Sequence, residues 1–226
     1  MPPRTTRHPR RRTDGLSPER IVDAAVEILD AEGEDGLTFR RLADLLVTGP
    51  GAIYHHVANK GELLVAATER ILAPATTVAS VDGLREEDAV RTVALAVFDA
   101  IDAHPWVGAQ LANPLQPAMV RLFESIGRQV RALGVPEAAL FTSTSALTNY
   151  ILGVGGLNAA NARVAGSTDR TDLLVTISAA WANLDPEEYP FTRDVAEQLR
   201  EHDDRTQFLD GIDLILAGIG ALGRRS

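Results

Sequence analysis

The chain has 226 residues, enough for one or two domains with a substantial core, and apolar residues make up 45% of it, which indicates a globular protein. It contains no cysteine, which excludes a disulfide scaffold, Cys-ligated metals and thiol chemistry. The net charge of −9 would by itself argue against a nucleic-acid partner. However, residues 1–60 hold nine basic and nine acidic residues, so the whole excess of acid lies after residue 60.

The first 16 residues are rich in Pro, Arg and Thr, and we expect them to be disordered in the absence of DNA. No apolar run follows them, so they resemble neither a signal peptide nor a membrane anchor. Two interpretations stay open, a solvated tail or a basic arm that attracts a polyanion through its local field. The five arginines without an acidic neighbour are Arg4, Arg7, Arg10, Arg11 and Arg12.

An amphipathic helix is predicted over residues 21–32. Ser17 supplies an N-cap, Pro18 suits the first helical position and Glu19 places an acid in the first turn. Gly33 is expected to end this helix. Its apolar stripe consists of Ile21, Ala24, Ala25, Ile28 and Leu29. We expect this helix to hold the next two in register.

Residues 37–60 contain two short helical patterns separated by about one turn. The hydroxyl of Thr38 is expected to cap the first pattern, and Thr48 to cap the second, in which Pro50 fits the first turn. The apolar stripes are Phe39, Leu42, Ala43 and Leu46 in the first pattern and Ile53 and Val57 in the second. Two short helices joined by a tight turn indicate a helix-turn-helix, whose second helix fits the DNA major groove.

The same stretch could instead be an αα-hairpin that serves only as structure within a helical protein–protein interaction module. Its composition argues against this alternative, because Asp44 is the sole acid between Phe39 and Lys60. Seven polar, basic or aromatic residues project over the short stretch, namely Arg40, Arg41, Tyr54, His55, His56, Asn59 and Lys60. DNA binding is therefore the favoured interpretation.

Residues 17–72 resemble the DNA-binding domain of the TetR (tetracycline repressor) family of bacterial transcription regulators. The resemblance lies in Gly36-Leu37-Thr38, Arg41-Leu42-Ala43, Gly51-Ala52-Ile53-Tyr54, His56-Val57 and the run from Asn59 to Leu64. One departure concerns the turn, where the family usually has Gly followed by an aliphatic residue and this chain has Val47 followed by Thr48.

Eight residues are candidates for DNA contacts. The amides that follow Thr38 should hold a phosphate. The resemblance implies that Arg40 reaches a base edge or the backbone, and that Tyr54, His56 and Lys60 contact the backbone. We expect the remaining three, which are Pro50, Ala52 and His55, to face the floor of the groove.

The rest of the chain is predicted to be helical, so the expected fold is all-α, with a DNA-binding domain at residues 17–60 and a regulatory domain at residues 61–226. A fourth helix should run from residue 60 to about residue 72, where Pro74 kinks or ends it. A polar loop is expected at residues 167–172 and a turn at residues 185–188. The other predicted helices are 84–104, 107–112, 117–133, 136–164, 173–184, 192–202 and 206–222.

Two of these helices, 136–164 and 206–222, carry more apolar surface than one modest domain needs. Both contain several glycines, and because an interior glycine costs a helix up to about 1 kcal/mol, their presence suggests that another backbone comes near. Packing within the core would also explain them. Since a regulator that reads a palindrome needs a two-fold dimer, we favour a homodimer interface of four helices.

The sequence contains no phosphate loop, HExxH motif or nucleophile elbow, so we expect no enzyme activity, cofactor or metal. Polar residues interrupt the charge-free run 138–160, which favours a buried helix over a membrane span, and a cytoplasmic protein is expected. The family resemblance implies a small-molecule effector that shifts the chain between two states. For any single candidate residue of its pocket, ordinary core packing is the favoured alternative. The candidates are Phe98, His104, Trp106, Leu111, Met119, Phe123, Asn149, Tyr150 and Trp181.

Overall fold

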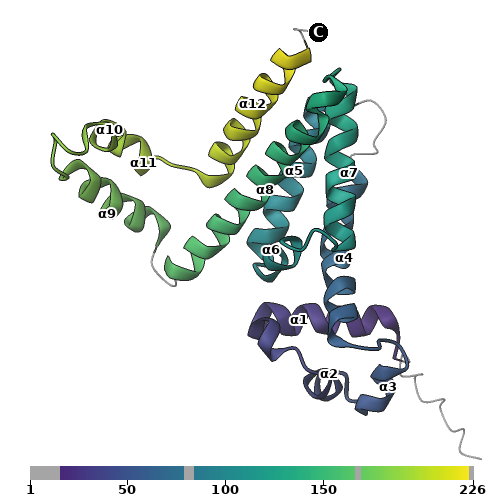
Figure 1. Ribbon diagram of the computed structural model, residues 1–226. Coiled ribbons are helices and arrows are strands. Elements are labelled where there is room, and N and C mark those ends of the chain that lie inside the picture. The colour runs from purple at the N-terminus through teal and green to yellow at the C-terminus, as the bar shows by residue number, and fades with distance from the viewer. Residues whose placement is uncertain (1–15, 79–83, 166–168, 224–226) are drawn as a thin grey trace, which may run out of the picture. The chain divides into compact units, whose positions relative to one another are not determined.

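The computed structural model describes residues 16–78, 84–165 and 169–223, and within these ranges the chain forms twelve α-helices and no strand (Figure 1). The predicted all-α class is therefore confirmed. The chain divides into two compact units, Met1–Ala67 and Thr68–Ser226. The five arginines of the predicted basic arm lie outside the described residues, as does part of the loop predicted at residues 167–172.

The first unit is built on three helices, α1 (Pro18–Gly36), α2 (Phe39–Leu46) and α3 (Pro50–Tyr54). Ser17 caps α1 as predicted, since its hydroxyl accepts a hydrogen bond from the Arg20 amide at 3.3 Å. Gly33 interrupts the regular helix where the sequence predicts its end, and helical residues resume beyond it as far as Gly36. Gly33 takes a left-handed φ of 71° and produces a kink within α1, because glycine has no Cβ to oppose that conformation. The predicted apolar stripe of α1 is buried, as are Leu42 and Ala43 of α2.

Helix α4 (Lys60–Val78) contains the boundary between the two units, which falls between Ala67 and Thr68. The prediction that it ends near residue 72 is wrong, because the helix continues through Pro74. A proline inside a helix costs about 3 kcal/mol. Leu72 and Ala75 are buried on either side of the proline, each with 2% of its surface exposed. Their burial stabilises the helix there and offsets that cost.

The second unit is centred on a long helix, α8 (Glu137–Ala165), which packs most extensively against three other helices. These partners are α5 (Glu86–Ala103), α7 (Pro117–Ala132) and α12 (Asp204–Gly223). A short helix, α6 (Trp106–Leu111), connects toward α7 and also contacts α5 and α8. The predicted helices agree with these bounds to within three residues.

Three further helices form a small lobe between α8 and α12, namely α9 (Arg170–Ala182), α10 (Pro190–Asp194) and α11 (Ala196–Arg200). They pack mainly on one another (Figure 1). The single helix predicted at residues 192–202 is wrong, because Val195 adopts φ −99°, ψ 0° and separates α10 from α11. Burial of Ala196 against α9 accompanies this change of direction.

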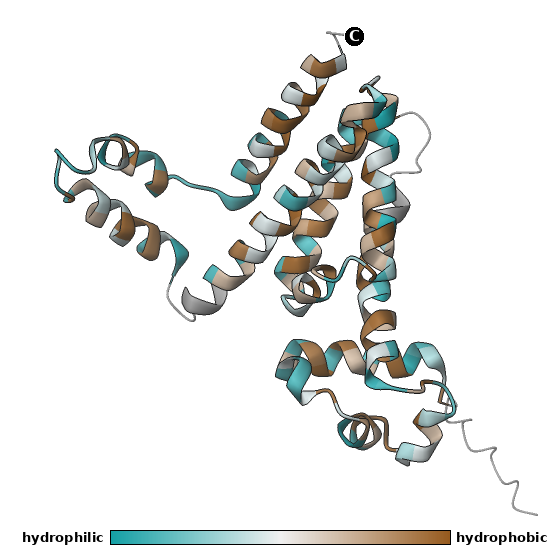
Figure 2. Ribbon diagram, viewed as in Figure 1, coloured by the Kyte–Doolittle hydropathy of each residue, from teal (hydrophilic) through white to brown (hydrophobic). Residues whose placement is uncertain are grey.

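Helix α12 is held on the body of the unit by two ion pairs and an apolar face. Arg205 pairs with Asp99 at 3.0 Å, and Asp213 pairs with Arg91 at 2.6 Å. Figure 2 shows further hydrophobic residues along α12, and Leu214 is 76% exposed. Among the described residues, α12 is also the one helix whose length and apolar composition would suffice to cross a membrane, and 22% of that stretch is buried.

Candidate nucleic-acid interface and ligand cavity

An aromatic stack fixes α3 against α2. The rings of Phe39 and Tyr54 lie parallel, with centroids 4.2 Å apart and an interplanar angle of 8°. Beneath them Leu42 and Ile53 are fully buried, which joins the two helices through a common core. A five-residue helix has little stability of its own, so these tertiary contacts determine where α3 lies.

The turn between α2 and α3 differs from the prediction. Thr38 caps α2 as expected, accepting from the Arg41 amide at 3.1 Å. Thr48 does not cap α3, because Gly49 holds that position and makes no side-chain cap. The Thr48 amide instead donates to the Ala43 carbonyl at 3.0 Å and closes the end of α2.

Val47 is in the left-handed region of the backbone, with φ 53° and ψ 51°. This conformation is unusual for a β-branched residue because its Cβ approaches the following carbonyl oxygen. The Val47 side chain is 92% exposed, so no burial compensates for the strain. The departure from the family's usual glycine thus has a measurable structural consequence.

Most of the predicted DNA-contacting side chains are open to solvent. Six of the eight candidates are exposed, namely Thr38, Arg40, Pro50, Tyr54, His55 and His56. Ala52 is half-buried, and Ile53 between these residues is directed into the core. The first turn of α2, the end of α3 and the two residues after it therefore present polar, basic and aromatic groups to solvent.

Lys60 makes a contact within the chain that sequence inspection missed. Its Nζ donates to the carbonyl of Glu34 at 2.6 Å and so links the start of α4 to the end of α1. This contact joins residues 26 apart, and no local pattern encodes it. Arg41 is likewise engaged, because its Nε donates to Glu32 at 2.8 Å, and this hydrogen bond raises the Arg41 pKa.

The start of α4 is closed by a reciprocal pair of caps. Asn59 accepts from the Glu62 amide at 2.9 Å, and the Glu62 carboxylate accepts from the Ala58 amide at 3.0 Å. This is a capping box, which the spacing of Asn59 and Glu62 could have revealed. It sets where the chain leaves α3 and begins α4.

The predicted effector residues do not form a single group. Phe98 and Tyr150 each stack on Phe208, with centroids 4.6 and 5.7 Å away. Burial raises the Tyr150 pKa, and its hydroxyl donates to the Phe208 carbonyl at 3.3 Å. The others are dispersed, with His104 beside Trp106, Leu111 in the core, Met119 and Phe123 on α7, Asn149 exposed on α8 and Trp181 on α9.

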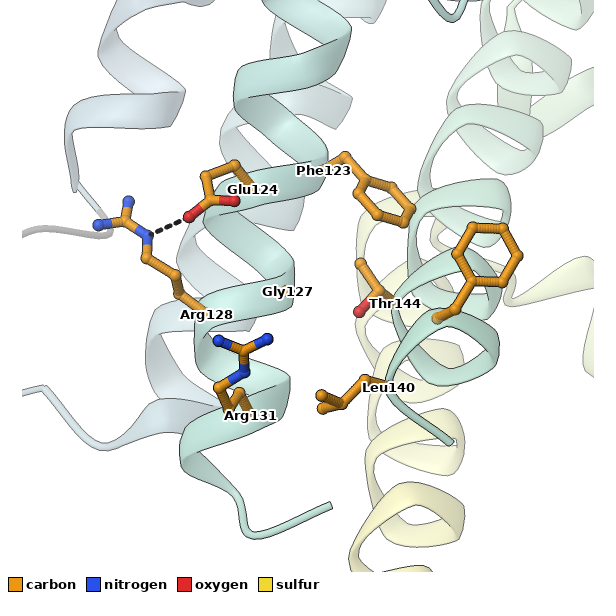
Figure 3. A pocket seen from close by; sticks show the side chains of 8 residues that line it. Phe123, Glu124, Gly127, Arg128, Arg131, Leu140 and Thr144 are labelled. Atoms are coloured by element: carbon orange, nitrogen blue, oxygen red, sulfur yellow. Dashed lines mark ion pairs between the residues drawn. The ribbon is translucent and has the colours of Figure 1, made fainter. Parts of the chain in front are cut away.

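Only two of these candidates, Met119 and Phe123, line a cavity that the described residues form between α7 and α8. Two adjoining cavities of about 240 and 360 Å³ share three lining residues, Phe123, Glu124 and Phe141. Sequence inspection missed Phe141 because the cavity depends on how two successive helices pack on each other. Figure 3 shows the smaller cavity between the two helices, and its remaining lining residues are Gly127, Arg128, Arg131, Leu140 and Thr144.

The glycines of α8 and α12, where the close approach of another backbone is predicted, differ in what surrounds them. A Cβ at Gly211 would overlap the Tyr150 hydroxyl, and one at Gly155 would lie 3.2 Å from the Ile101 side chain. Side chains of this chain, rather than a second backbone, therefore explain those two. Gly153, Gly156 and Gly218 have open space where a Cβ would stand.

Two family models match the chain in order. Residues 21–67 match the bacterial regulatory proteins of the tetR family, and residues 83–222 match the tetracyclin repressor-like C-terminal domain. The HTH-type transcriptional repressor DrrR1 of Streptomyces coeruleorubidus is 31% identical over 140 residues, which are 61% of this chain and 52% of that protein. The chain thus spans about half the length of this curated relative.

Solved structures extend the similarity over nearly the whole chain. The transcriptional regulator SCO7222, a TetR from Streptomyces coelicolor, is 56% identical with a TM-score of 0.84, covering 92% of this chain and all of that one. ActR of Streptomyces coelicolor in complex with actinorhodin is 25% identical (TM-score 0.72; 92% and 98% coverage). BioQ with its double-stranded DNA operator is 28% identical (TM-score 0.58; 92% and 99% coverage). The chain therefore belongs to the TetR family of bacterial transcriptional regulators.

Proposed function

We propose that this chain is a ligand-responsive repressor that binds a palindromic DNA operator as a homodimer in the cytoplasm and leaves it when a small molecule binds. The observation that carries the proposal is an exposed set of side chains, with Tyr54 at the end of α3 and His55 and His56 directly after it, on a segment fixed by the Phe39 stack. A helix so held can enter the major groove without further folding. The matched repressor DrrR1 and the operator complex of BioQ support the same function.

The candidate residues divide into two proposed roles. Arg40 and His55 read base edges, because a guanidinium or an imidazole can donate to acceptors that only some base pairs present in the major groove. Thr38, Tyr54, His56 and Lys60 hold phosphates, which fixes the register of the protein on DNA without reading its sequence. Pro50 and Ala52 offer only apolar contact, such as to a thymine methyl.

The proposed dimer uses the outward faces of α8 and α12. Leu157 of α8 is 65% exposed and Leu214 of α12 is 76% exposed, although both lie on helices that pack on the body of the unit. The open space at Gly153 and Gly218 would let a second copy approach these faces closely. Such an interface would also account for the apolar composition of α12 without a membrane.

A small-molecule effector in the second unit is supported by two observations. The α7–α8 cavities provide apolar space lined by Met119 and Phe123. ActR, of similar fold, has been crystallised with actinorhodin. The rival interpretation, an interaction module without DNA binding, is not favoured, and nothing in the proposal requires a catalytic role.

A salt-dependent gel shift on DNA from upstream of the chain's own gene tests the proposal. We expect a specific complex whose binding constant falls steeply as salt rises, because phosphate contacts release counterions. His55→Ala should relax the preference for the specific site, whereas Lys60→Ala should weaken binding to every sequence. If Lys60→Ala instead altered sequence choice at unchanged affinity, the assigned roles would be wrong.

A further inference from the structure

The cavity between α7 and α8 has an aromatic end. The rings of Phe123 and Phe141 have centroids 6.1 Å apart and an interplanar angle of 49°, and both line each of the adjoining cavities. Phe141 is 74% exposed, so the core does not cover its ring and a ligand can contact it. Tilted rings at this spacing suit a planar molecule, which can lie against one face and meet the edge of the other.

The floor of the cavity is open because α7 carries Gly127 at this point. A Cβ there would meet Thr144 at 3.6 Å, which is ordinary van der Waals contact, so close packing does not demand the glycine. A longer side chain at position 127 would enter the space between the helices. The Thr144 side chain faces α7 across this space and adds a hydroxyl to the wall (Figure 3).

The charges around the cavity do not balance. Arg128 pairs with Glu124 at 3.7 Å, and Figure 3 shows both side chains directed away from α8. Arg131 also lines the cavity, and its guanidinium has no ion pair or hydrogen bond among the described residues. One positive charge is thus left beside an aromatic, largely apolar space.

We infer that the α7–α8 cavity binds an aromatic acid, whose rings lie against Phe123 and Phe141 and whose anionic group pairs with Arg131. The inference rests on the proposed function, since it names the chemical class of the effector. The guanidinium presents paired donors that match a carboxylate or a sulfonate. A neutral aromatic of the same shape would use the rings but leave the charge of Arg131 unused.

Two probes that differ in a single anionic group test this inference on the full chain. The first is 8-anilinonaphthalene-1-sulfonate, and the second is N-phenyl-1-naphthylamine, which lacks the sulfonate. Titration followed by probe fluorescence should show the sulfonate binding about tenfold more tightly, as one charge-assisted hydrogen bond of about 1.5 kcal/mol allows. Equal affinities for the two probes would overturn the inference.

Variants then test whether the preference for the sulfonate probe arises at the α7–α8 cavity. Arg131→Gln should remove the tenfold preference and leave the neutral probe unaffected, while Arg131→Lys should retain part of it. Arg200→Gln, which makes the same charge change on α11, should leave the preference intact. Gly127→Leu should abolish binding of both probes, because its side chain occupies the cavity. If Arg131→Gln retained the full preference, the anion would bind elsewhere and the inference would fail.

A gel shift without probe tests the proposed repressor function separately from the ligand class of the cavity. All these variants lie outside the first unit, so each should still bind operator DNA. Operator binding without an Arg131-dependent preference would reject the aromatic acid and keep the repressor. Loss of operator binding by the unmodified chain, with the probe preference present, would reject the repressor and keep the cavity's ligand class.

Discussion

The two surfaces on which this account depends differ in chemistry. Around α3 most of the exposed side chains are polar, basic or aromatic, with Val47 and Pro50 as apolar exceptions, and the apolar Ile53 is buried. Along α8 and α12 the exposed groups include Leu157 and Leu214, while the ion pairs that Arg205 and Asp213 of α12 make with Asp99 and Arg91 lie where α12 meets α5. The first surface suits a charged, hydrated partner such as DNA, and the second suits another apolar surface, which a second copy would supply.

The largest expected effect comes from breaking the apolar surface. Leu214→Arg should dissociate the dimer, because burying a leucine contributes about 1.5–3 kcal/mol and the change occurs in both copies. Light scattering should show a monomer, and operator affinity should fall at least about a hundredfold. Leu115→Arg, at an equally exposed leucine outside α8 and α12, serves as the control and should remain dimeric. A dimeric Leu214→Arg would move the interface elsewhere.

A smaller effect is expected at Gly211, where α12 meets α8 within one chain. Gly211→Ala should lower the free energy of unfolding by about 1–2 kcal/mol, since its Cβ would overlap the Tyr150 ring and overpacking exceeds the gain in helix propensity. Thermal denaturation measures the loss.

The control is Tyr150→Leu, tested alone and together with Gly211→Ala. If the overlap is the cause, the double-mutant cycle should show the alanine becoming neutral or stabilising once the ring is gone. An unchanged cost in the leucine background would contradict this explanation.

At the recognition surface, two changes to Tyr54 should separate stability from DNA contact. Tyr54→Phe keeps the stack on Phe39, so the melting temperature should hold while affinity for all DNA sequences falls up to about tenfold, as loss of one phosphate contact implies. Tyr54→Ala should lower both, because the stack itself is worth about 0.5–1.5 kcal/mol. Unchanged DNA affinity in Tyr54→Phe would remove the hydroxyl from the interface.

The smallest expected effect concerns the strained turn. Val47→Gly should raise the free energy of unfolding by up to about 1 kcal/mol, because glycine relieves the 1–2 kcal/mol strain of the left-handed conformation but adds freedom to the unfolded chain. Chemical denaturation of the first unit's transition measures it. Val47→Ala is the control, since alanine keeps a Cβ and should recover less of that strain. A destabilised glycine variant would mean that the valine side chain has a favourable role.

Features set by neighbouring residues could be predicted from the sequence, and features set by distant segments could not. The caps at Ser17 and Thr38 and the buried stripe of α1 follow from residues within three or four positions. The contact of Lys60 with Glu34 joins two helices, so no local pattern contains it. At Pro74 the local pattern gave a wrong prediction. Proline usually ends a helix, but the burial of Leu72 and Ala75 on either side of it keeps α4 helical through this residue.

The candidate site shows the same division. The exposed residues of α3 were identified because a short motif fixes which positions point inward. Aromatic character alone could not distinguish two of the nine pocket candidates from each other. Phe98 is stacked on Phe208 in the core, whereas Phe123 lines a cavity. Phe141 and Arg131 become neighbours of that cavity only through the packing of α7 on α8.

Footprinting on DNA upstream of the chain's own gene examines the recognition surface and the dimer in one experiment. A dimer that binds through both recognition helices should protect two half-sites related by a two-fold axis, with their centres about 34–36 Å apart or a multiple of that distance. Protection of a single half-site by the intact chain, or no salt-sensitive protection at all, would contradict the proposed dimeric repressor.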